Sequence, residues 1–165
     1  MIRIGVISDT HLTDTAESSA LLQCIAADCF RDVEMVIHAG DVVDPAVLTI
    51  FTPCPVYGVR GNMDPSSANL PYKRILQVEG VRIGVIHGWG SADRLVERIF
   101  REFAETPVDC LVFGHSHTPM CRHEDGVLLF NPGSATDRRG MPWESVGILE
   151  VSHGTVNGRI LRLGR

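Results

Sequence analysis

The apolar run at residues 110–113 leads directly into a turn that carries two histidines. The run is Cys110-Leu111-Val112-Phe113, and the turn is Gly114-His115-Ser116-His117. Because alternate side chains of an extended chain point to one face, this spacing predicts that both imidazoles face one point. Two imidazoles aimed at one point indicate a metal ion. For the pair alone, hydrogen-bonded capping of a buried strand is the alternative interpretation.

The rest of the chain divides into short apolar segments and amphipathic helices. Strands are predicted at residues 2–7, 35–38, 55–59, 72–78, 81–86, 110–113, 120–123, 127–130, 145–151 and 155–163. Apolar residues at helical spacing predict a helix of about 13 residues with a capping signal at Asp14, a short helix from Pro45 to Phe51, and a helix capped by Ser91. This order predicts an α/β fold in which two mixed sheets pack face to face with helices outside, as a single domain over residues 1–165.

Composition excludes several classes of protein. With 44% hydrophobic residues, 21% charged residues and a formal net charge of −5, the chain resembles a soluble globular domain. It lacks the broad basic surface that extended nucleic-acid binding requires. Five cysteines without a C-x-x-C pair do not suggest a disulfide framework. Met1 runs directly into a strand-like segment and no apolar run is long enough to span a bilayer, so we expect a cytoplasmic protein with no membrane partner.

Polar side chains of the types that bind metals follow the predicted strands at their carboxyl ends. In chain order they are Asp9, His11, Asp41, Asn62, His87, His115 and His117. In open α/β sheets the carboxyl ends of the strands form the edge where ligands bind. The sequence therefore predicts that separate loops bring these side chains to one rim.

The number and kind of these side chains indicate more than one metal ion. Two carboxylates, one amide and four imidazoles exceed what a single tetrahedral ion takes. They suit two ions of higher coordination number that share a carboxylate, and manganese, iron, nickel, cobalt and zinc all accept such ligands. Two ions about 3.5 to 4 Å apart can hold a hydroxide between them and stabilise an in-line displacement at phosphorus. The pattern predicts an enzyme that hydrolyses phosphoesters.

These residues carry a family resemblance over nearly the whole chain. The blocks are Asp9-Thr10-His11, Gly40-Asp41, Gly61-Asn62, His87 and Gly114-His115-Ser116-His117, which resemble the signature of the calcineurin-like metallophosphoesterases. The short length, the sequence Gly61-Asn62-Met63-Asp64 and the sequence Asn131-Pro132-Gly133-Ser134 are similar to the small single-domain bacterial and archaeal phosphodiesterases. The resemblance implies a four-layer αββα sandwich, phosphodiesterase activity on a small phosphoester, and two divalent metal ions with manganese favoured.

The resemblance also implies a role for each block by position. Asp9, His11 and His117 would bind the first ion, Asn62, His87 and His115 would bind the second, and Asp41 would bridge the two. Asp41, Asn62 and His87 would then surround the hydroxide that attacks phosphorus. Asn62 would also contact the substrate.

One position departs from the pattern of the protein phosphatases in this superfamily. They place a proton-donating histidine directly after the Gly-Asn pair, and this chain has Met63 there. Methionine has no proton to give, which predicts a preference for acidic leaving groups such as aryl oxides. Asp64 is a candidate to orient His87 or His115, and a cap on the turn before Pro65 is the alternative.

Further residues are candidates for contacts around the site. Asn131 and Ser134 would present backbone N–H groups to a phosphate or to a metal-bound water, with a plain Asn-Pro-Gly turn as the alternative. Arg60 and one of Arg138 or Arg139 are candidates to clamp that phosphate. His38 is a candidate to support the site by hydrogen bonds, and an ordinary buried histidine is the alternative.

Three other functions fit the same residues. One is a DNA-repair nuclease of the same superfamily, against which the short acidic chain argues. A phosphomonoesterase uses the same pair of ions, and only the shape of the substrate pocket separates it from a diesterase. From a different class, the retromer subunit that resembles this branch acts as a scaffold through protein contacts. The complete set of four histidine ligands favours the enzyme, since a scaffold need not keep them. The resemblance also implies a homodimer or homotetramer.

Overall fold

In the computed structural model, which describes residues 1–164, ten strands form two five-stranded sheets. The first sheet has the order β10-β9-β1-β2-β3, with β1 (Ile2–Ile7), β2 (Met35–His38), β3 (Val56–Gly58), β9 (Ser145–Ser152) and β10 (Thr155–Arg162). The second has the order β4-β5-β6-β8-β7, with β4 (Lys73–Val78), β5 (Val81–Ile86), β6 (Cys110–Val112), β7 (Met120–Glu124) and β8 (Val127–Asn131). Both sheets mix parallel and antiparallel pairs.

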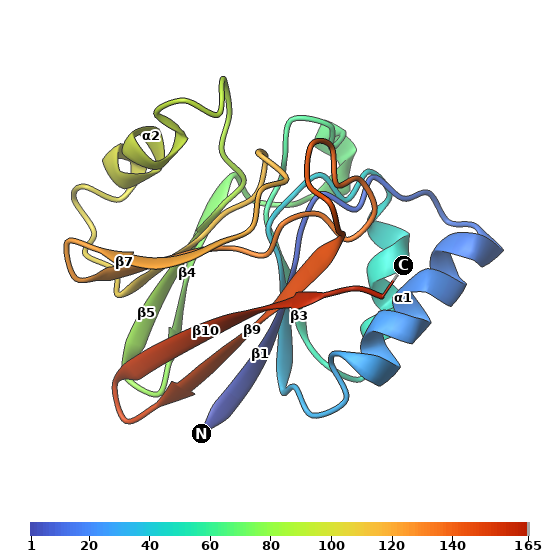
Figure 1. Cartoon of the computed structure of the whole chain (residues 1–165), viewed down its shortest axis with the longest axis horizontal. Coiled ribbons are helices and arrows are strands. Elements are labelled where there is room, and N and C mark those ends of the chain that lie inside the picture. The colour runs from blue at the N-terminus through green and yellow to red at the C-terminus, as the bar shows by residue number, and fades with distance from the viewer. Residues whose placement is uncertain (165) are drawn as a thin grey trace.

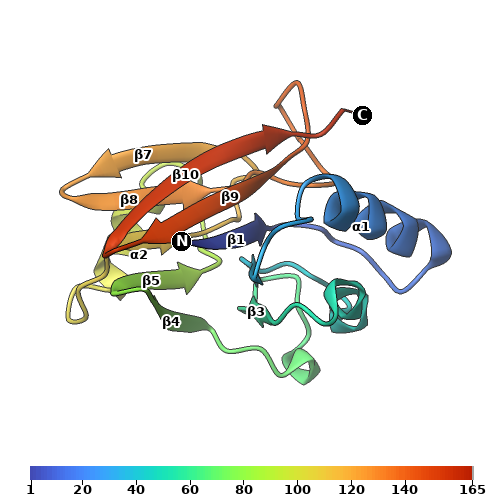
Figure 2. The same ribbon diagram turned by 90° about the horizontal axis from the view of Figure 1, so that it is seen from below.

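Helices cover the outer faces of the two sheets. Figures 1 and 2 show α1 (Ala16–Asp28) beside the first sheet and α2 (Leu95–Glu102) at the far side of the second. Two 3-10 helices, η1 (Pro45–Phe51) and η2 (Ser66–Ala68), lie in the connections that follow β2 and β3. The predicted αββα sandwich of two mixed sheets is confirmed.

Three apolar clusters hold these layers together. Between the sheets, Ile4 and Ile37 of the first sheet lie in one cluster with Ile83 and Val112 of the second. A second cluster joins the first sheet to α1 and η1, and a third joins the second sheet to α2. Because each sheet buries both faces, its central strands are almost continuously apolar, which explains why they are easily predicted from the sequence.

The helix starts differ from the predictions in two places, and the short helix from Pro45 to Phe51 keeps its predicted bounds. The cap of α1 is Thr15, whose hydroxyl accepts from the Ser18 N–H at 3.1 Å, and not Asp14. The segment from Pro45 is a 3-10 helix, capped by Asp44. Ser91 does not cap α2, because its hydroxyl donates to the carbonyl of Asp93 and the helix begins only at Leu95.

The topology brings the ends of six strands to one edge of the sandwich. Strands β1, β2 and β3 run parallel in the first sheet, and β5, β6 and β8 run parallel in the second. Figure 1 shows the loops that follow these strands together at the upper end of the molecule. The residues that the sequence analysis placed after strands therefore lie in neighbouring loops.

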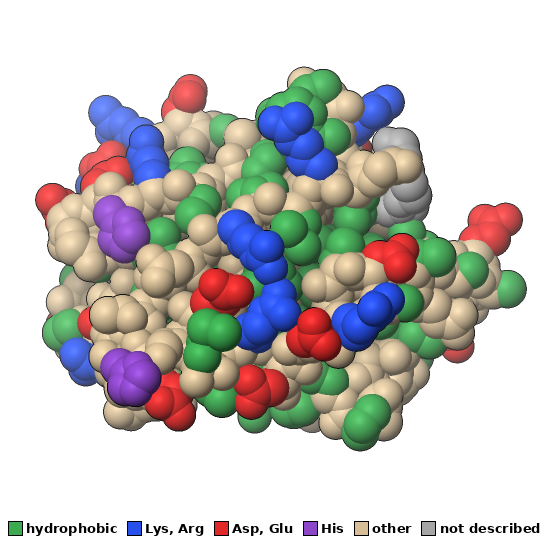
Figure 3. All heavy atoms as spheres, turned by 60° about the horizontal axis from the view of Figure 1, so that its bottom comes forward, with side chains coloured by type: hydrophobic (Ala, Val, Ile, Leu, Met, Phe, Trp, Pro, Cys, Tyr) green, Lys and Arg blue, Asp and Glu red, His purple; other side chains and the backbone are tan. Residues whose placement is uncertain are grey.

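The side of the molecule away from these loops carries charges of both signs. Figure 3 shows this face from below, with Lys and Arg side chains interspersed among Asp and Glu. For example, the guanidinium of Arg3 lies 3.4 Å from Asp32 and 3.5 Å from Glu150. Among residues 1–164, no helix is both long and apolar enough to cross a membrane.

Candidate metal centre

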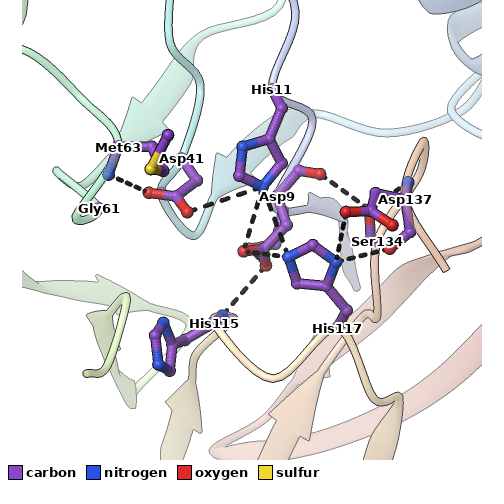
Figure 4. Close-up of polar contacts among 12 residues, drawn as sticks. Asp9, His11, Asp41, Gly61, Met63, His115, His117, Ser134 and Asp137 are labelled. Atoms are coloured by element: carbon purple, nitrogen blue, oxygen red, sulfur yellow. Dashed lines mark hydrogen bonds and ion pairs between the residues drawn. The ribbon is translucent and has the colours of Figure 1, made fainter. Parts of the chain in front are cut away.

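Two buried carboxylates each keep one oxygen free of protein donors. Asp9 Oδ2 accepts from the Ser8 hydroxyl at 2.6 Å and from the His115 N–H at 3.1 Å, whereas Asp9 Oδ1 is buried without a hydrogen-bond partner. Asp41 Oδ1 accepts from the Met63 N–H at 2.8 Å, and Asp41 Oδ2 faces two imidazoles. Each carboxylate is thus fixed by one oxygen and presents the other to the centre of the cluster (Figure 4).

Glycines make room for both carboxylates. A Cβ on Gly61 would lie 2.2 Å from Asp41 Oδ1, and a Cβ on Gly114 would lie 2.1 Å from the Ser8 hydroxyl and 2.6 Å from Asp9 Oδ2. Any side chain at either position would displace a carboxylate, so these two glycines are required by close approach. This is the physical reason that glycine precedes Asn62 and His115 in the sequence.

Three of the imidazoles are oriented by backbone carbonyls. His87 Nδ1 lies 2.7 Å from the Ala39 carbonyl, His115 Nε2 lies 2.7 Å from the Gly90 carbonyl, and His117 Nδ1 lies 2.5 Å from the Asp137 carbonyl. Since a carbonyl only accepts, each of these nitrogens carries the proton. In the neutral ring the other nitrogen is then a lone-pair donor, and in all three histidines it faces the cluster.

The atoms that could bind a metal ion form two groups that share Asp9. In the first, His117 Nε2 lies 3.2 Å from Asp9 Oδ1 and 3.4 Å from His11 Nε2. In the second, His87 Nε2 lies 3.3 Å from Asp41 Oδ2 and 3.8 Å from Asp9 Oδ1. The structure thus places Asp9, as well as the predicted bridge Asp41, between the two groups.

Asn62 and His115 extend the second group. The Asn62 Oδ1 lies 3.1 Å from His87 Nε2 and 3.3 Å from His115 Nδ1. All seven residues predicted as ligands therefore lie in one connected cluster, although their roles toward a metal stay predictions.

The prediction that His115 and His117 face one point, as alternate residues of an extended chain, is wrong. His115 and His117 lie beyond the strand with φ of 67° and 58°, and they face different groups: His115 faces Asn62 and His117 faces Asp9. Asp9, His11 and Asp41 also have positive φ, at 53°, 47° and 57°. Left-handed backbone in non-glycine residues is uncommon and gathers at functional sites, where the surrounding structure holds the strain.

The electrostatics of the cluster keep the carboxylates ionised. Burial alone raises the pKa of Asp9, but the imidazoles of His117, 3.2 Å from Oδ1, and of His87 outweigh it and bring the pKa below its usual value. For Asp41, the imidazole of His87, 3.3 Å from Oδ2, likewise outweighs burial and lowers the pKa. Burial lowers the pKa of His87 and of His117, but the carboxylates of Asp41 and Asp9 respectively reverse this and raise both pKa values.

These observations fit a metal centre. A buried carboxylate oxygen with no donor is costly, and a bound cation would satisfy Asp9 Oδ1. The imidazole lone pairs and carboxylate oxygens within 4.8 Å of one another are the donor types that divalent transition ions accept. Without an ion, protons on His87 and His117 balance the carboxylates, as their raised pKa values indicate.

Asp64 holds the loop that carries Asp41, and does not orient an imidazole as predicted. Its Oδ2 accepts from the N–H groups of Asp41 at 2.9 Å and Gly61 at 2.7 Å, and its Oδ1 accepts from Val43 at 2.7 Å. It thus fixes the turns after β2 and β3 to each other. The alternative prediction, that Asp64 caps a turn, is closer to the hydrogen bonds that the structure shows.

Asn131 and Ser134 are engaged within the protein. Both are buried: Asn131 Nδ2 donates to the Gly114 carbonyl at 3.0 Å, and the Ser134 hydroxyl donates to the Asp9 carbonyl at 2.8 Å. These side chains hold the loops that carry Asp9 and His115, and the predicted contact of the backbone N–H groups with a phosphate stays a prediction. The Asp137 carbonyl, which orients His117, was missed because a backbone acceptor leaves no signal in the sequence.

The two neighbouring arginines point to different partners. Arg138 was the predicted phosphate contact, but its guanidinium donates to the Pro142 carbonyl at 3.2 Å. Arg139 lies nearer to the cluster, with its Nη1 3.5 Å from the His115 carbonyl. Of the two residues, the structure favours Arg139 as the one beside the site.

His38 is a buried structural histidine. It is fully buried, its Nε2 lies 3.0 Å from the Thr10 hydroxyl, and its Nδ1 accepts from the Gly40 N–H at 3.2 Å. It therefore links the loops that carry Asp9 and Asp41 without offering a lone pair to the cluster. Burial lowers the pKa of His38 to about 4.

We expect the metal-free protein to lose stability as the pH falls from 6.5 towards 4. Between these values the folded state keeps His38 neutral while the unfolded chain takes up the proton, so acid favours unfolding. The loss reaches roughly 3 kcal/mol by pH 4, from 1.36 kcal/mol per pKa unit. Urea unfolding across this range checks it, with His38→Asn expected to flatten the slope and exposed His123→Asn expected to keep it. An unchanged slope in His38→Asn would contradict the assignment.

A sandwich whose strand ends gather carboxylates and imidazoles has the architecture of a metal-dependent hydrolase. The family model for the calcineurin-like phosphoesterase superfamily domain matches residues 2–154. A probable metallophosphoesterase of Methanothermobacter thermautotrophicus is 37% identical, over 98% of this chain and 92% of its own length. The chain therefore belongs to the calcineurin-like phosphoesterase superfamily.

Solved structures share the fold at lower identity. A structure described as a novel archaeal phosphodiesterase aligns with a TM-score of 0.72 and 23% identity, over 97% of this chain and 100% of the other. Vps29 from Chaetomium thermophilum aligns with a TM-score of 0.75 and 20% identity, over 99% and 97%. At these identities the likeness supports the fold alone.

Proposed function

We propose that this protein is a phosphodiesterase that hydrolyses small phosphoesters with two divalent metal ions, manganese favoured. The main observation in support is that Asp9 Oδ1 is buried without a hydrogen-bond partner and lies among three imidazole nitrogens. Its distance is 3.2 Å to His117 Nε2, 3.8 Å to His87 Nε2 and 4.0 Å to His11 Nε2. Asp9, His11 and His117 would hold one ion, and Asn62, His87 and His115 the other, with Asp41 between them. Bound ions would supply Lewis acidity and activate water for attack on phosphorus.

The rest of the proposal concerns what the chain itself does. Asp64, Asn131 and Ser134 hold the loops in place, so that the donors are fixed before any ion or substrate arrives. Among residues 1–164, Arg139 is the arginine whose side chain hydrogen-bonds to one of the proposed ligand residues. A cytoplasmic location and a homodimer or homotetramer belong to the same proposal.

A screen of metal-stripped protein tests the proposed function. The protein is treated with a chelator, supplied with manganese, iron, nickel, cobalt or zinc singly, and assayed on an aryl diester, an aryl monoester and cyclic nucleotides. We expect hydrolysis of diesters that depends on the added ion. Faster hydrolysis of the monoester would favour a phosphomonoesterase instead. Metal binding without any hydrolysis would favour a scaffold, which acts through protein contacts and needs no catalysis.

We expect the rate to depend steeply on the acidity of the leaving group. Met63 stands directly after Asn62, the residue is 57% exposed, and it cannot donate a proton. Without a general acid, worth about 10²- to 10⁴-fold, poorly acidic leaving groups depart slowly. The check is kcat for a series of aryl diesters plotted against leaving-group pKa, with Met63→His expected to flatten the slope. A flat dependence in the unaltered protein would sink this prediction.

A further inference from the structure

Two aromatic rings lie exposed and in contact beside the candidate metal centre. Tyr72 is 46% exposed and Trp89 is 37% exposed, and their ring centroids are 6.2 Å apart at an interplanar angle of 44°. Single exposed apolar side chains need no explanation, but two large aromatic side chains that share one exposed patch point to binding. We call Tyr72 and Trp89 the aromatic pair.

Both members of the aromatic pair are attached to loops that carry proposed ligands. Trp89 lies between His87 and Gly90, and the Gly90 carbonyl accepts from His115 Nε2 at 2.7 Å. Tyr72 follows Pro71, whose carbonyl accepts from the Arg60 N–H at 2.8 Å, two residues before Asn62. The aromatic pair is therefore on loops next to the group formed by Asn62, His87 and His115.

The loop that carries Trp89 is held rigidly. The guanidinium of Arg98, on α2, donates to the carbonyl of Trp89 at 3.0 Å, to that of Asp93 at 3.0 Å, and to that of Ser91. Gly88 and Gly90 supply the positive φ values, 98° and 79°, that the loop needs on either side of the tryptophan. A rigid aromatic side chain on a fixed loop loses little conformational entropy when a ligand stacks on it.

We propose that the aromatic pair is a binding subsite for a planar aromatic group carried by the substrate's phosphate. The inference rests on the proposed function, because the phosphate itself would be held at the metal centre. Stacking on an aromatic side chain needs only a π-face, so an aryl ester and a nucleoside base both meet the requirement. An aryl ester also supplies an acidic leaving group, which a site with Met63 after Asn62 requires. Two independent features therefore favour aromatic phosphoesters.

Binding of phosphonates, which are not hydrolysed, tests the subsite apart from the chemistry. Phenylphosphonate and methylphosphonate are titrated into manganese-loaded protein, with tryptophan fluorescence as the readout. The chain has two tryptophans, so Trp143→Phe leaves Trp89 as the reporter. We expect phenylphosphonate to bind about fivefold tighter or more than methylphosphonate and to change the Trp89 fluorescence. A nucleoside 5′-phosphonate in the same assay distinguishes a base from an aryl group as the ring that stacks.

Matched variants separate stacking from damage to the loop. The ratio of the two Kd values, measured by competitive inhibition or calorimetry, is expected to fall to about one in Trp89→Ala and to be retained in Trp89→Phe. Ile75→Ala, which removes another exposed apolar side chain on β4, is expected to keep the ratio. Unchanged binding of methylphosphonate in Trp89→Ala shows that the metal centre is intact.

The outcomes distinguish this inference from the proposed function. Equal binding of the two phosphonates to the unaltered protein, with metal-dependent hydrolysis present, overturns the subsite and leaves the enzyme. A ratio that persists in Trp89→Ala also overturns it. If neither phosphonate binds and no phosphoester is hydrolysed with any ion, the proposed function fails and the subsite fails with it.

Discussion

Replacement of Asp41 by asparagine is expected to lower hydrolysis of an aryl diester by about a thousandfold. The change removes the charge from Oδ2, which lies 3.3 Å from His87 Nε2 and 3.7 Å from His11 Nε2, between the two groups of donors. Metal ions contribute several kcal/mol to stabilising the transition state, and each 1.36 kcal/mol is worth tenfold in rate. The measurements are kcat with manganese and the number of ions bound, by calorimetry. We expect fewer ions bound and an unfolding profile without metal that still shows one cooperative transition.

Asp44→Asn is the matched control for Asp41→Asn. Asp44 lies three residues further on, where its carboxylate caps η1 by accepting from the Ala46 N–H at 3.0 Å, so the same chemical change there leaves the site untouched. Asp9→Asn completes the comparison, because Asp9 Oδ1 lies near three imidazoles. A greater loss of bound metal in Asp9→Asn than in Asp41→Asn would identify Asp9 as the shared ligand. Undiminished hydrolysis in Asp41→Asn would rule out Asp41 as a bridge.

The layers of this fold can be predicted because burial on both faces leaves a simple pattern. Runs such as Ile2–Ile7 and Val81–Ile86 are apolar and β-branched, and each ends at a ligand-type residue. The start of α2 could not be predicted from Ser91, a good capping residue by type. Arg98, five to seven residues further along the chain, holds the carbonyls of Ser91 and Asp93 outside the helix. A side-chain contact with the backbone here overrides the capping preference of Ser91.

The members of the candidate site could be predicted, but not how they are held. Residue types and their places after strands predicted seven side chains, and all seven gather in one cluster. The left-handed backbone at Asp9 and Asp41 has no sequence signal, since nothing about aspartate demands it. An aspartate after Gly-Asn suits the orientation of an imidazole as well as the hydrogen bonds that Asp64 makes to loop N–H groups. Only the folded structure shows that Asn131 and Ser134 use their side chains to hold backbone carbonyls of neighbouring loops.

Metal loading is expected to raise the Tm of the protein by about 10 °C, and to do so more at pH 8 than at pH 6. An ion at a thousand times its Kd stabilises by about 4 kcal/mol, which for 165 residues corresponds to about 8 to 16 °C. Ligand imidazoles must be neutral to bind, so an ion displaces the protons that the raised pKa values of His87 and His117 retain. The apparent affinity for manganese therefore falls as the pH is lowered through those raised pKa values.

The metal-free protein is expected to show the opposite trend over the same range. A histidine whose pKa is raised on folding stabilises the folded state fully below its unfolded pKa of about 6.5, and this contribution is lost as the pH rises through the folded pKa. The Tm without metal should thus fall from pH 6.5 to pH 8 while the Tm with manganese holds or rises. His117→Gln should release about one proton fewer on metal binding, and exposed His123→Gln should match the unaltered protein. If the Tm with and without manganese runs parallel against pH, His87 and His117 are not the groups that give up protons to a metal ion.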